Sequence, residues 1–448
     1  MEIALFLFAL IIRLWNFSDI EFKLDEALAV FKASQYWFTG KLPLYGLISS
    51  TGAANPPLFL YLLSIPALIS PNPLFLTFFF AVTGSLSVLV IFKVLKNLLS
   101  EKFAFFSALL FATSAWPVIF SRKIWAQNLM PLLSSLVFYY FFEILSDEKK
   151  STTPLIVLAL WAFQIHLSGF LIFFPVLVFL TFFNFKKRKI LLKEVFLGIL
   201  FGTIPLVPYF LFLIKDEFRN FLLLFGSRSG ALPFYDFHNF TSPFRMSAGF
   251  YFARSLGADY FEFIQTLPYS KIIFGFFNLE SFLAVLGFFL CFLLQGKFLI
   301  LAFGFIIMAT ISFLSKRPAI PFYQEPYFPL IFAFLGVSFW QIFQLKFFGK
   351  ILFSLIFLLS LGSNIVFISH FYNFVHRKQQ INGDYGLVYW QKEKLVQEAV
   401  KNFKYHLKES QIVTRARVYF SIFNYDKDKK VYLPQKELLP VVNFELGQ

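Results

Sequence analysis

Long apolar segments recur along the chain and are separated by short polar gaps. Runs such as Pro73–Leu95 and Ile351–Ser369 are long enough to cross a hydrocarbon layer, which takes about 20 helical residues. The predicted spans are residues 2–17, 73–97, 102–120, 125–145, 152–166, 168–184, 191–214, 271–294, 297–315, 326–344 and 348–370. This pattern predicts an all-α polytopic membrane protein with about 11–12 transmembrane helices.

The composition agrees with this pattern. Of the 448 residues, 58% are hydrophobic and 15% are charged, whereas about 25% are charged in an ordinary soluble domain. The net charge of +15 comes mostly from Lys and Arg in the gaps between apolar runs, and no basic stripe interleaved with stacking aromatic residues occurs. Composition therefore excludes a soluble protein, and we expect no nucleic-acid partner.

The basic residues in the gaps predict the orientation of the chain. Four gaps carry Lys93, Lys96 and Lys102; Lys149 and Lys150; Lys186, Lys187, Arg188 and Lys189; and Lys346 and Lys350. If the N-terminus is cytoplasmic, all four gaps are cytoplasmic, as the positive-inside rule requires. The apolar segment Pro57–Ile69 is shorter than a usual span, so we expect a re-entrant or interfacial helix there. Counting it as a crossing would invert every later loop.

With this orientation, several polar segments face the outer side of the membrane. They are the loop 18–56, the turn 121–125, the long connection 215–270 and the junction 316–327. We expect outer juxtamembrane helices in these loops, within a transmembrane domain at 1–370. After about residue 371 the chain becomes charged and mixed, which predicts a small α+β extracytoplasmic region at 371–448. Its expected elements are a helix at 390–403 and strands at 412–423 and 431–433.

Asp25 and Glu26 are adjacent carboxylates in the first outer loop, just beyond the first span. Neighbouring residues on a helix diverge by about 100°, so the two side chains cannot share one task. One could face a substrate while the other caps the following helix or binds a cation. A solvated helix N-terminus, which favours acidic residues, is the alternative interpretation.

The loop that begins at Gly46 is rich in small residues and ends in Asn55-Pro56-Pro57 before an apolar helix. Proline suits the first turn of a helix because its missing N–H is not needed there. The backbone amides that remain unpaired at such a helix start can receive an anion such as phosphate. An ordinary loop is the alternative interpretation.

Arg122 and Lys123 lie between two tryptophans at the outer boundary of the membrane. Cations on that side run against the positive-inside bias. Arg122 could hold a phosphate through two parallel hydrogen bonds. Tryptophans at the boundary are also a routine interfacial belt, which is the alternative interpretation of this segment.

Two further outer positions carry candidate binding residues. His166 interrupts two apolar helices and could bind a phosphate, a sugar hydroxyl or a metal, although a lone histidine is often structural. The junction 316–327 carries Glu325 and Tyr327, for which membrane anchoring is the alternative. No metal-ligand spacing, P-loop or nucleophile elbow occurs in the sequence, which weakens hydrolase and ATPase interpretations.

Taken together, these residues resemble the GT-C class of multispanning glycosyltransferases, specifically the protein-mannosyltransferase and aminoarabinose-transferase-like group of glycosyltransferase family 39. The resemblance rests on Asp25-Glu26-Ala27, Thr39-Gly40, Asn55-Pro56-Pro57-Leu58, Ser121-Arg122 and Tyr327-Phe328-Pro329. It covers residues 10–190 well and the later spans loosely.

The resemblance implies a sugar donor carried on a polyprenyl phosphate and a lipid, glycan or protein acceptor outside the cell membrane. It also implies a metal dependence that varies among members, so a divalent metal stays an open option and no ligands for one are assigned. Asp25 matches the family's catalytic acid in its first outer loop, which implies a general base. Glu26 is a second catalytic candidate, as a supporting residue whose role stays open. Many relatives carry Lys before the double proline, where this chain has Asn55. The implied ligands of the donor phosphate or sugar are Arg122, Lys123, Asn55, His166, Tyr327 and Glu325.

Two other functions stay open on the sequence. A transporter or flippase of a lipid-linked saccharide would share the many spans and the basic outer residues, but it predicts ionisable residues at mid-membrane and broken helices in corresponding halves. A ligase or polymerase of polysaccharide units would share most of the same outer residues.

Overall fold

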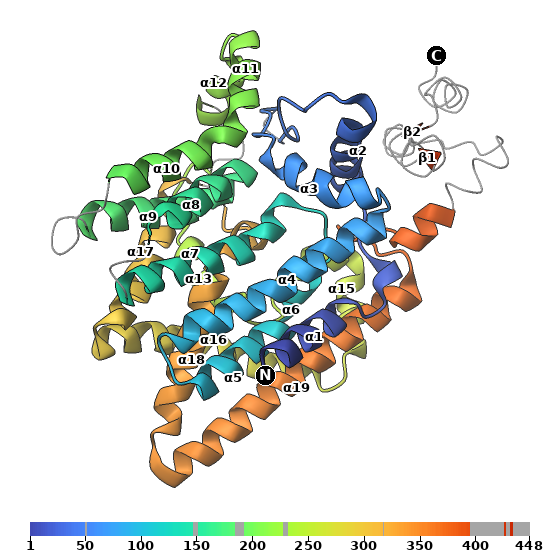
Figure 1. Cartoon of the computed structure of the whole chain (residues 1–448). Coiled ribbons are helices and arrows are strands. Elements are labelled where there is room, and N and C mark those ends of the chain that lie inside the picture. The colour runs from blue at the N-terminus through green and yellow to red at the C-terminus, as the bar shows by residue number, and fades with distance from the viewer. Residues whose placement is uncertain are drawn as a thin grey trace.

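The computed structural model describes residues 1–49, 52–146, 151–183, 192–226, 232–316 and 318–394, together with 425–426 and 431–432. The described chain is almost entirely helical (Figure 1). Its α-helices are α1 (Glu2–Arg13), α2 (Leu24–Thr39), α3 (Leu58–Ile69), α4 (Pro73–Lys96), α5 (Glu101–Thr113), α6 (Ala115–Phe120), α7 (Met130–Ser146), α8 (Thr153–Ile165), α9 (Phe170–Phe183), α10 (Leu192–Thr203), α11 (Val207–Lys215), α12 (Arg219–Gly226), α13 (His238–Arg245), α14 (Ala253–Leu256), α15 (Tyr260–Thr266), α16 (Ser270–Leu294), α17 (Lys297–Leu314), α18 (Phe328–Phe343) and α19 (Lys346–Lys378). The 3-10 helices are η1 (Phe17–Asp19), η2 (Ala126–Leu129), η3 (Leu167–Gly169), η4 (Ile204–Leu206), η5 (Gly257–Asp259), η6 (Pro321–Tyr323) and η7 (Glu325–Tyr327).

Seven helical segments of the described chain are long and apolar enough to cross a membrane. They are Pro73–Lys96, Ala126–Ser146, Leu192–Lys215, Ser270–Leu294, Lys297–Leu314, Glu325–Phe343 and Lys346–Lys378. Each coincides with a predicted span. The other predicted spans correspond to shorter helices, because α1, α5, α8 and α9 have 12, 13, 13 and 14 residues. The prediction of an all-α polytopic membrane protein is confirmed.

The predicted span 102–120 is divided in two at Ser114. This residue is extended, with ψ 136°, and its hydroxyl donates to the carbonyl of Ser247 at 2.8 Å. Pro117 then falls in the first turn of α6, where the missing N–H costs nothing. The break makes room for the segment around Ser247 to reach the bundle at this level.

Arg13 ends α1 and faces the protein. Its side chain is fully buried, and its guanidinium donates to the carbonyl oxygens of Ala9 at 2.9 Å, Ala112 at 3.3 Å and Pro117 at 3.4 Å. An arginine at a membrane helix end needs such acceptors when it does not reach water. These bonds fasten α1 to the junction between α5 and α6.

The bundle is centred on α18, which packs closely against α16. Gly287 of α16 makes this approach possible, because a Cβ there would lie 1.9 Å from the carbonyl oxygen of Phe334. Helix α4 packs between α7 and α5, and α8 packs against α10 (Figure 1). Small residues at such contacts let helix backbones come together where water cannot drive association.

Helix α3 is the segment predicted to be re-entrant or interfacial. Its 12 residues rise about 18 Å, well short of a hydrocarbon layer of about 30 Å. One side packs on α2 and α4, while Ile65, Leu68 and Ile69 are largely exposed. This length favours a helix that does not span, and its place in the bilayer stays a prediction.

Polar segments far apart in the sequence meet at one end of the bundle. The side chain of Asp236, from the long connection 215–270, accepts a hydrogen bond from the backbone of Ala319 at 3.0 Å. Asp259 accepts one from the backbone of Asn382 at 2.7 Å. The connection 215–270 therefore contacts both the junction 316–327 and the segment after α19, whereas the side of the membrane that these segments face stays a prediction.

Helix α19 continues to Lys378, beyond the end of the predicted span at residue 370. A helical stretch at 389–394 lies where a helix was predicted at 390–403. The predicted strand at 431–433 is present as β2 (Val431–Tyr432), which pairs in antiparallel fashion with β1 (Tyr425–Asp426). The rest of the predicted helix and the predicted strand at 412–423 lie outside the described residues.

Candidate active site

At the start of α2, the two adjacent acids of the first outer loop lie in different environments. Glu26 is fully buried, and its Oε2 accepts a hydrogen bond from the backbone N–H of Lys23 at 3.0 Å. Asp25 is exposed, and within the described chain no cation or hydrogen-bond donor contacts its carboxylate. One acid therefore closes the helix start from inside while the other points outward, as the angular separation predicts.

The burial of Glu26 has an electrostatic consequence. Loss of solvent raises its pKa to about 7, and the neighbouring Glu21 carboxylate adds to the rise. Lys123, the backbone hydrogen bond and Lys23 act in the opposite direction but do not cancel it. Glu26 is thus a group that changes charge near neutral pH directly beside Asp25.

Lys123 is buried in an ion pair with Glu21, a residue that the sequence analysis did not single out. Glu21 is 3% exposed and lies between Lys123 and Lys23, with an ion pair to each. The Lys123 ammonium also lies 4.4 Å from the centre of the Trp125 ring. A phosphate bound by Lys123 would compete with a buried carboxylate, and phosphate binding by this residue stays a prediction.

Arg122 holds the corner between α1 and η1. Its two terminal nitrogens donate to the carbonyl oxygens of Trp15 and Asn16, each at 2.8 Å. The guanidinium also lies 4.1 Å from the centre of the Tyr372 ring. Both ends of the fork are therefore engaged with protein, and the predicted phosphate contact would require displacing them.

Asp19 is a second buried acid that the sequence analysis missed. Its carboxylate contacts the His376 Nδ1 at 2.7 Å and accepts from the Trp390 indole N–H at 2.9 Å. Its carbonyl accepts from the Tyr385 hydroxyl at 2.6 Å. The only signal in the sequence was a third and fourth acid in the loop that carries Asp25. The partners of Asp19 lie more than 350 positions away, beyond the reach of local patterns.

Asn55 belongs to a small hairpin that precedes α3. Its side-chain amide donates to the carbonyl of Leu47 at 2.9 Å, and its backbone carbonyl accepts from Gly46 at 2.7 Å. Asn220 of α12 fixes the hairpin by accepting from the backbone N–H of Ala54 at 2.6 Å and donating to its carbonyl at 3.0 Å. The Asn55 side chain therefore shapes the loop, and its predicted contact with a donor stays a prediction.

His166 and the junction 316–327 are brought together. The His166 ring stacks on Tyr323 with ring centres 5.5 Å apart, and its Nδ1 accepts from the backbone of Ser168 at 3.0 Å. Tyr327 is fully buried against Phe305 inside the protein. The structure thus places His166 beside the junction but turns Tyr327 into the core.

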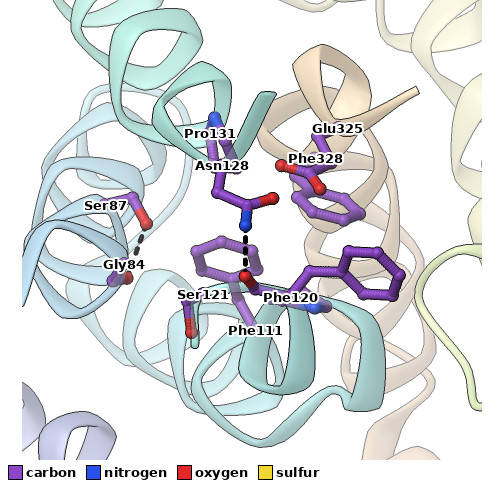
Figure 2. A pocket seen from close by; sticks show the side chains of 10 residues that line it. Gly84, Ser87, Phe111, Phe120, Ser121, Asn128, Pro131, Glu325 and Phe328 are labelled. Carbon is purple, nitrogen blue, oxygen red and sulfur yellow. Dashed lines mark hydrogen bonds between the residues drawn. The ribbon is translucent and has the colours of Figure 1, made fainter. Parts of the chain in front are cut away.

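Glu325 points into a small internal cavity that Figure 2 shows from close by. The cavity has a volume of about 10 Å³, which is room for about one water molecule. Asn128 and Ser121 line it from the neighbouring segments, and the Asn128 amide donates to the carbonyl of Phe120. Glu325 is 1% exposed, so a sugar cannot reach it in this conformation.

Metal ligands do not gather in the part of the chain that the structure describes. No group of three or more His, Cys, Asp or Glu side chains there has the arrangement of a metal site. The described residues therefore offer no set of ligands from which a metal could be identified. Cys291 is a buried free thiol in α16.

Residues 54–212 match the family model described as dolichyl-phosphate-mannose-protein mannosyltransferase. The fold is similar to that of ArnT from Cupriavidus metallidurans bound to undecaprenyl phosphate, with a TM-score of 0.51 and 13% identity over 83% of this chain and 75% of that chain. The apo form of the same protein gives a TM-score of 0.51 and 14% identity over the same shares.

The chain therefore shares the fold of ArnT, and its residues 54–212 are similar to the mannosyltransferase family model. The Archaeoglobus fulgidus oligosaccharyltransferase in complex with Zn and sulfate is more distant, with a TM-score of 0.45 and 13% identity over 90% of this chain and 55% of that chain. No curated protein sequence matches this chain significantly.

Proposed function

We propose that the chain transfers a sugar from a polyprenyl-phosphate-linked donor to an acceptor hydroxyl, with Asp25 as the general base. The observation that supports this proposal is the different environment of the two adjacent acids at the start of α2. Glu26 is buried and fixes the helix, while Asp25 is exposed and unpaired within the described chain. An unpaired carboxylate on a rigid helix start is suited to accept a proton.

The chemistry requires the following exchange of bonds. Asp25 takes the proton of the acceptor hydroxyl as its oxygen attacks the anomeric carbon of the donor sugar. The bond from that carbon to the phosphate oxygen breaks, and its electron pair leaves with the polyprenyl phosphate. The products are the glycosylated acceptor, a protonated Asp25 that returns its proton to water, and a phosphate with one more negative charge.

The donor class is supported by two features. The similar ArnT structure is bound to undecaprenyl phosphate, by its description. In the present chain, α7, α9 and α17 line a partly open apolar cavity of about 190 Å³, with residues such as Phe138, Phe179 and Met308. Ser134 at its edge donates to the carbonyl of Pro326, so the cavity lies next to the junction 316–327. Such a space suits a hydrocarbon chain.

We assign the site to the extracytoplasmic face of the cell membrane. This assignment is supported by the distribution of Lys and Arg. These residues are concentrated in the gaps at the other ends of the spans from Asp25, and the positive-inside rule places such gaps in the cytoplasm. A lipid-linked donor needs no nucleotide at the moment of transfer, which suits a face away from the cytoplasm. Cysteine labelling near Ser146 and near Ser227 tests the assignment, because the two positions should react from opposite sides. Labelling of both from outside would overturn it.

The test of the base is Asp25→Asn in purified protein supplied with a panel of polyprenyl-phosphate sugars. General-base catalysis contributes about 10²- to 10⁴-fold, so we expect transfer to fall by about that factor. Asp384→Asn is the matched control, since Asp384 is a half-exposed acid paired with Arg254. Turnover of Asp25→Asn equal to that of the control would refute the assignment of the base.

A further inference from the structure

The face of α2 that carries Asp25 carries one more charged residue. Seven residues along a helix correspond to 700°, so Lys32 lies within about 20° of Asp25 and about 10.5 Å further along the axis. The burial pattern agrees, because Ala29, Val30 and Ala33 are fully buried while Asp25 is exposed and Lys32 is half-buried. Base and ammonium therefore stand on one side of one helix.

In the part of the chain that the structure describes, Lys32 lacks the anionic partner that Lys23 and Lys123 have. Within the described chain its ammonium makes one long hydrogen bond, to the carbonyl of Gly46 at 3.4 Å, and lies 5.0 Å from the centre of the Tyr45 ring. Lys23 and Lys123, by contrast, are both paired with Glu21. Burial lowers the pKa of Lys32, which is the effect of desolvation on an ammonium with no carboxylate beside it.

The position of Lys32 is fixed by the hairpin before α3. Gly46, which receives the hydrogen bond, is paired with Asn55 across the hairpin. The Tyr45 ring packs on Phe212 of α11 with ring centres 4.6 Å apart. The ammonium of Lys32 therefore has a defined location, at the hairpin that leads into α3. Figure 1 shows α2 and α3 side by side.

We propose that Lys32 binds the phosphate of the donor and stabilises the charge that develops on it as the sugar leaves. This inference rests on the proposed function. In the transition state, the base and the leaving phosphate lie on opposite sides of the anomeric carbon. One hydrogen bond of about 2.8 Å joins the base to the acceptor hydroxyl, and another of about 2.8 Å joins the phosphate to the ammonium, with the forming and breaking bonds between them. That path is about 10 Å long, close to the separation of Asp25 and Lys32 along α2. A cation placed where charge develops is the largest common source of rate enhancement.

The experiment measures binding of farnesyl phosphate and of farnesol, which lacks the phosphate, to the full chain in detergent. A charge-assisted hydrogen bond corresponds to about a 10- to 100-fold change in affinity, so Lys32→Gln should weaken farnesyl phosphate binding by that factor. Farnesol binding should not change. Lys32→Arg should restore most of the affinity, and Lys41→Gln, an exposed lysine of the same loop, should leave it as in the wild type.

The outcomes separate this inference from the proposed function. Wild-type affinity in Lys32→Gln, in a protein that transfers sugar normally, would overturn the role of Lys32 and leave the function intact. Wild-type protein that neither binds farnesyl phosphate nor transfers sugar from any donor would overturn both. Asp25→Asn should keep farnesyl phosphate binding while losing transfer, because it changes the base alone.

A second measurement needs no variant and so does not depend on folding of Lys32→Gln. Reductive methylation of the wild-type protein followed by mass spectrometry reports the access of reagent to each lysine. Farnesyl phosphate, but not farnesol, should slow modification of Lys32 and leave Lys41 unaffected. Equal modification of Lys32 with both compounds, under conditions where farnesyl phosphate is bound, would refute the contact.

Discussion

Replacing Glu26 with glutamine tests whether a carboxyl that titrates near neutral pH lies beside the proposed base. Glutamine keeps the shape of the side chain and an oxygen that can accept from the backbone of Lys23. It removes the charge that burial disfavours. The effect should therefore appear in the pH dependence of stability more than in the fold.

The magnitude follows from the raised pKa. The difference between 4.5 and about 7 for Glu26, at about 1.4 kcal/mol for each pH unit, corresponds to about 3 kcal/mol. Because the folded pKa lies above the unfolded one, the native state binds the extra proton between these values. The wild-type protein should thus lose about 3 kcal/mol of stability as the pH rises from about 4.5 to about 7, and no more from this group above that.

The assay is equilibrium unfolding in mixed detergent micelles between pH 5 and pH 8, for wild type, Glu26→Gln and Glu217→Gln. Glu217 is an exposed glutamate paired with Arg219, and it controls for the loss of one acid. Glu26→Gln should show a flatter pH dependence than the other two proteins. The same slope in all three would refute the buried, titrating Glu26.

Two further changes test the packing around the site. Lys123→Met leaves Glu21 with one partner fewer in the interior, so unfolding experiments should show a loss of up to about 3–5 kcal/mol, largely recovered when Glu21→Met is added. If the free energy of unfolding of Lys123→Met does not recover when Glu21→Met is added, the buried ion pair is refuted. Gly287→Ala places a Cβ 1.9 Å from the carbonyl of Phe334 and should lower the melting temperature clearly, whereas Gly275→Ala in the same helix meets nothing within 4 Å. Equal melting temperatures for the two variants would contradict the close contact of α16 and α18.

The sequence predicted those parts of the fold that depend on local composition. Long runs such as Pro73–Lys96 and Ser270–Leu294 follow directly from the cost of placing a polar backbone in hydrocarbon. The break at Ser114 was not predictable in the same way, because it depends on a hydrogen bond to Ser247, a residue 133 positions away. The burial of Arg13 likewise depends on carbonyl oxygens of α5 and α6, about 100 positions away.

The candidate site was predictable in its acids but not in its cations. The angular rule for helices separates Asp25 from Glu26, and the structure shows that separation. The exposed-looking Arg122 and Lys123 are instead taken up by carbonyl oxygens and by Glu21, which only the tertiary structure brings near. Lys32 drew no attention in the sequence because a single lysine on an amphipathic helix is ordinary. Only the tertiary structure shows that its ammonium lies at the hairpin before α3, on the face of α2 that carries Asp25.

The first outer loop is joined to the segment that follows the last long helix. The backbone of Tyr389 donates to the carbonyl of Ile20 at 3.1 Å, Glu21 bridges to Val388, and the Lys392 ammonium donates to the carbonyl of Phe22. Residues 20–22, just before α2, are thus bound directly to residues 388–392, which follow α19. A shortened protein that stops at the end of α19 would keep every span and still lose the support behind Asp25. Expression designs for this chain therefore need to retain the residues up to 394.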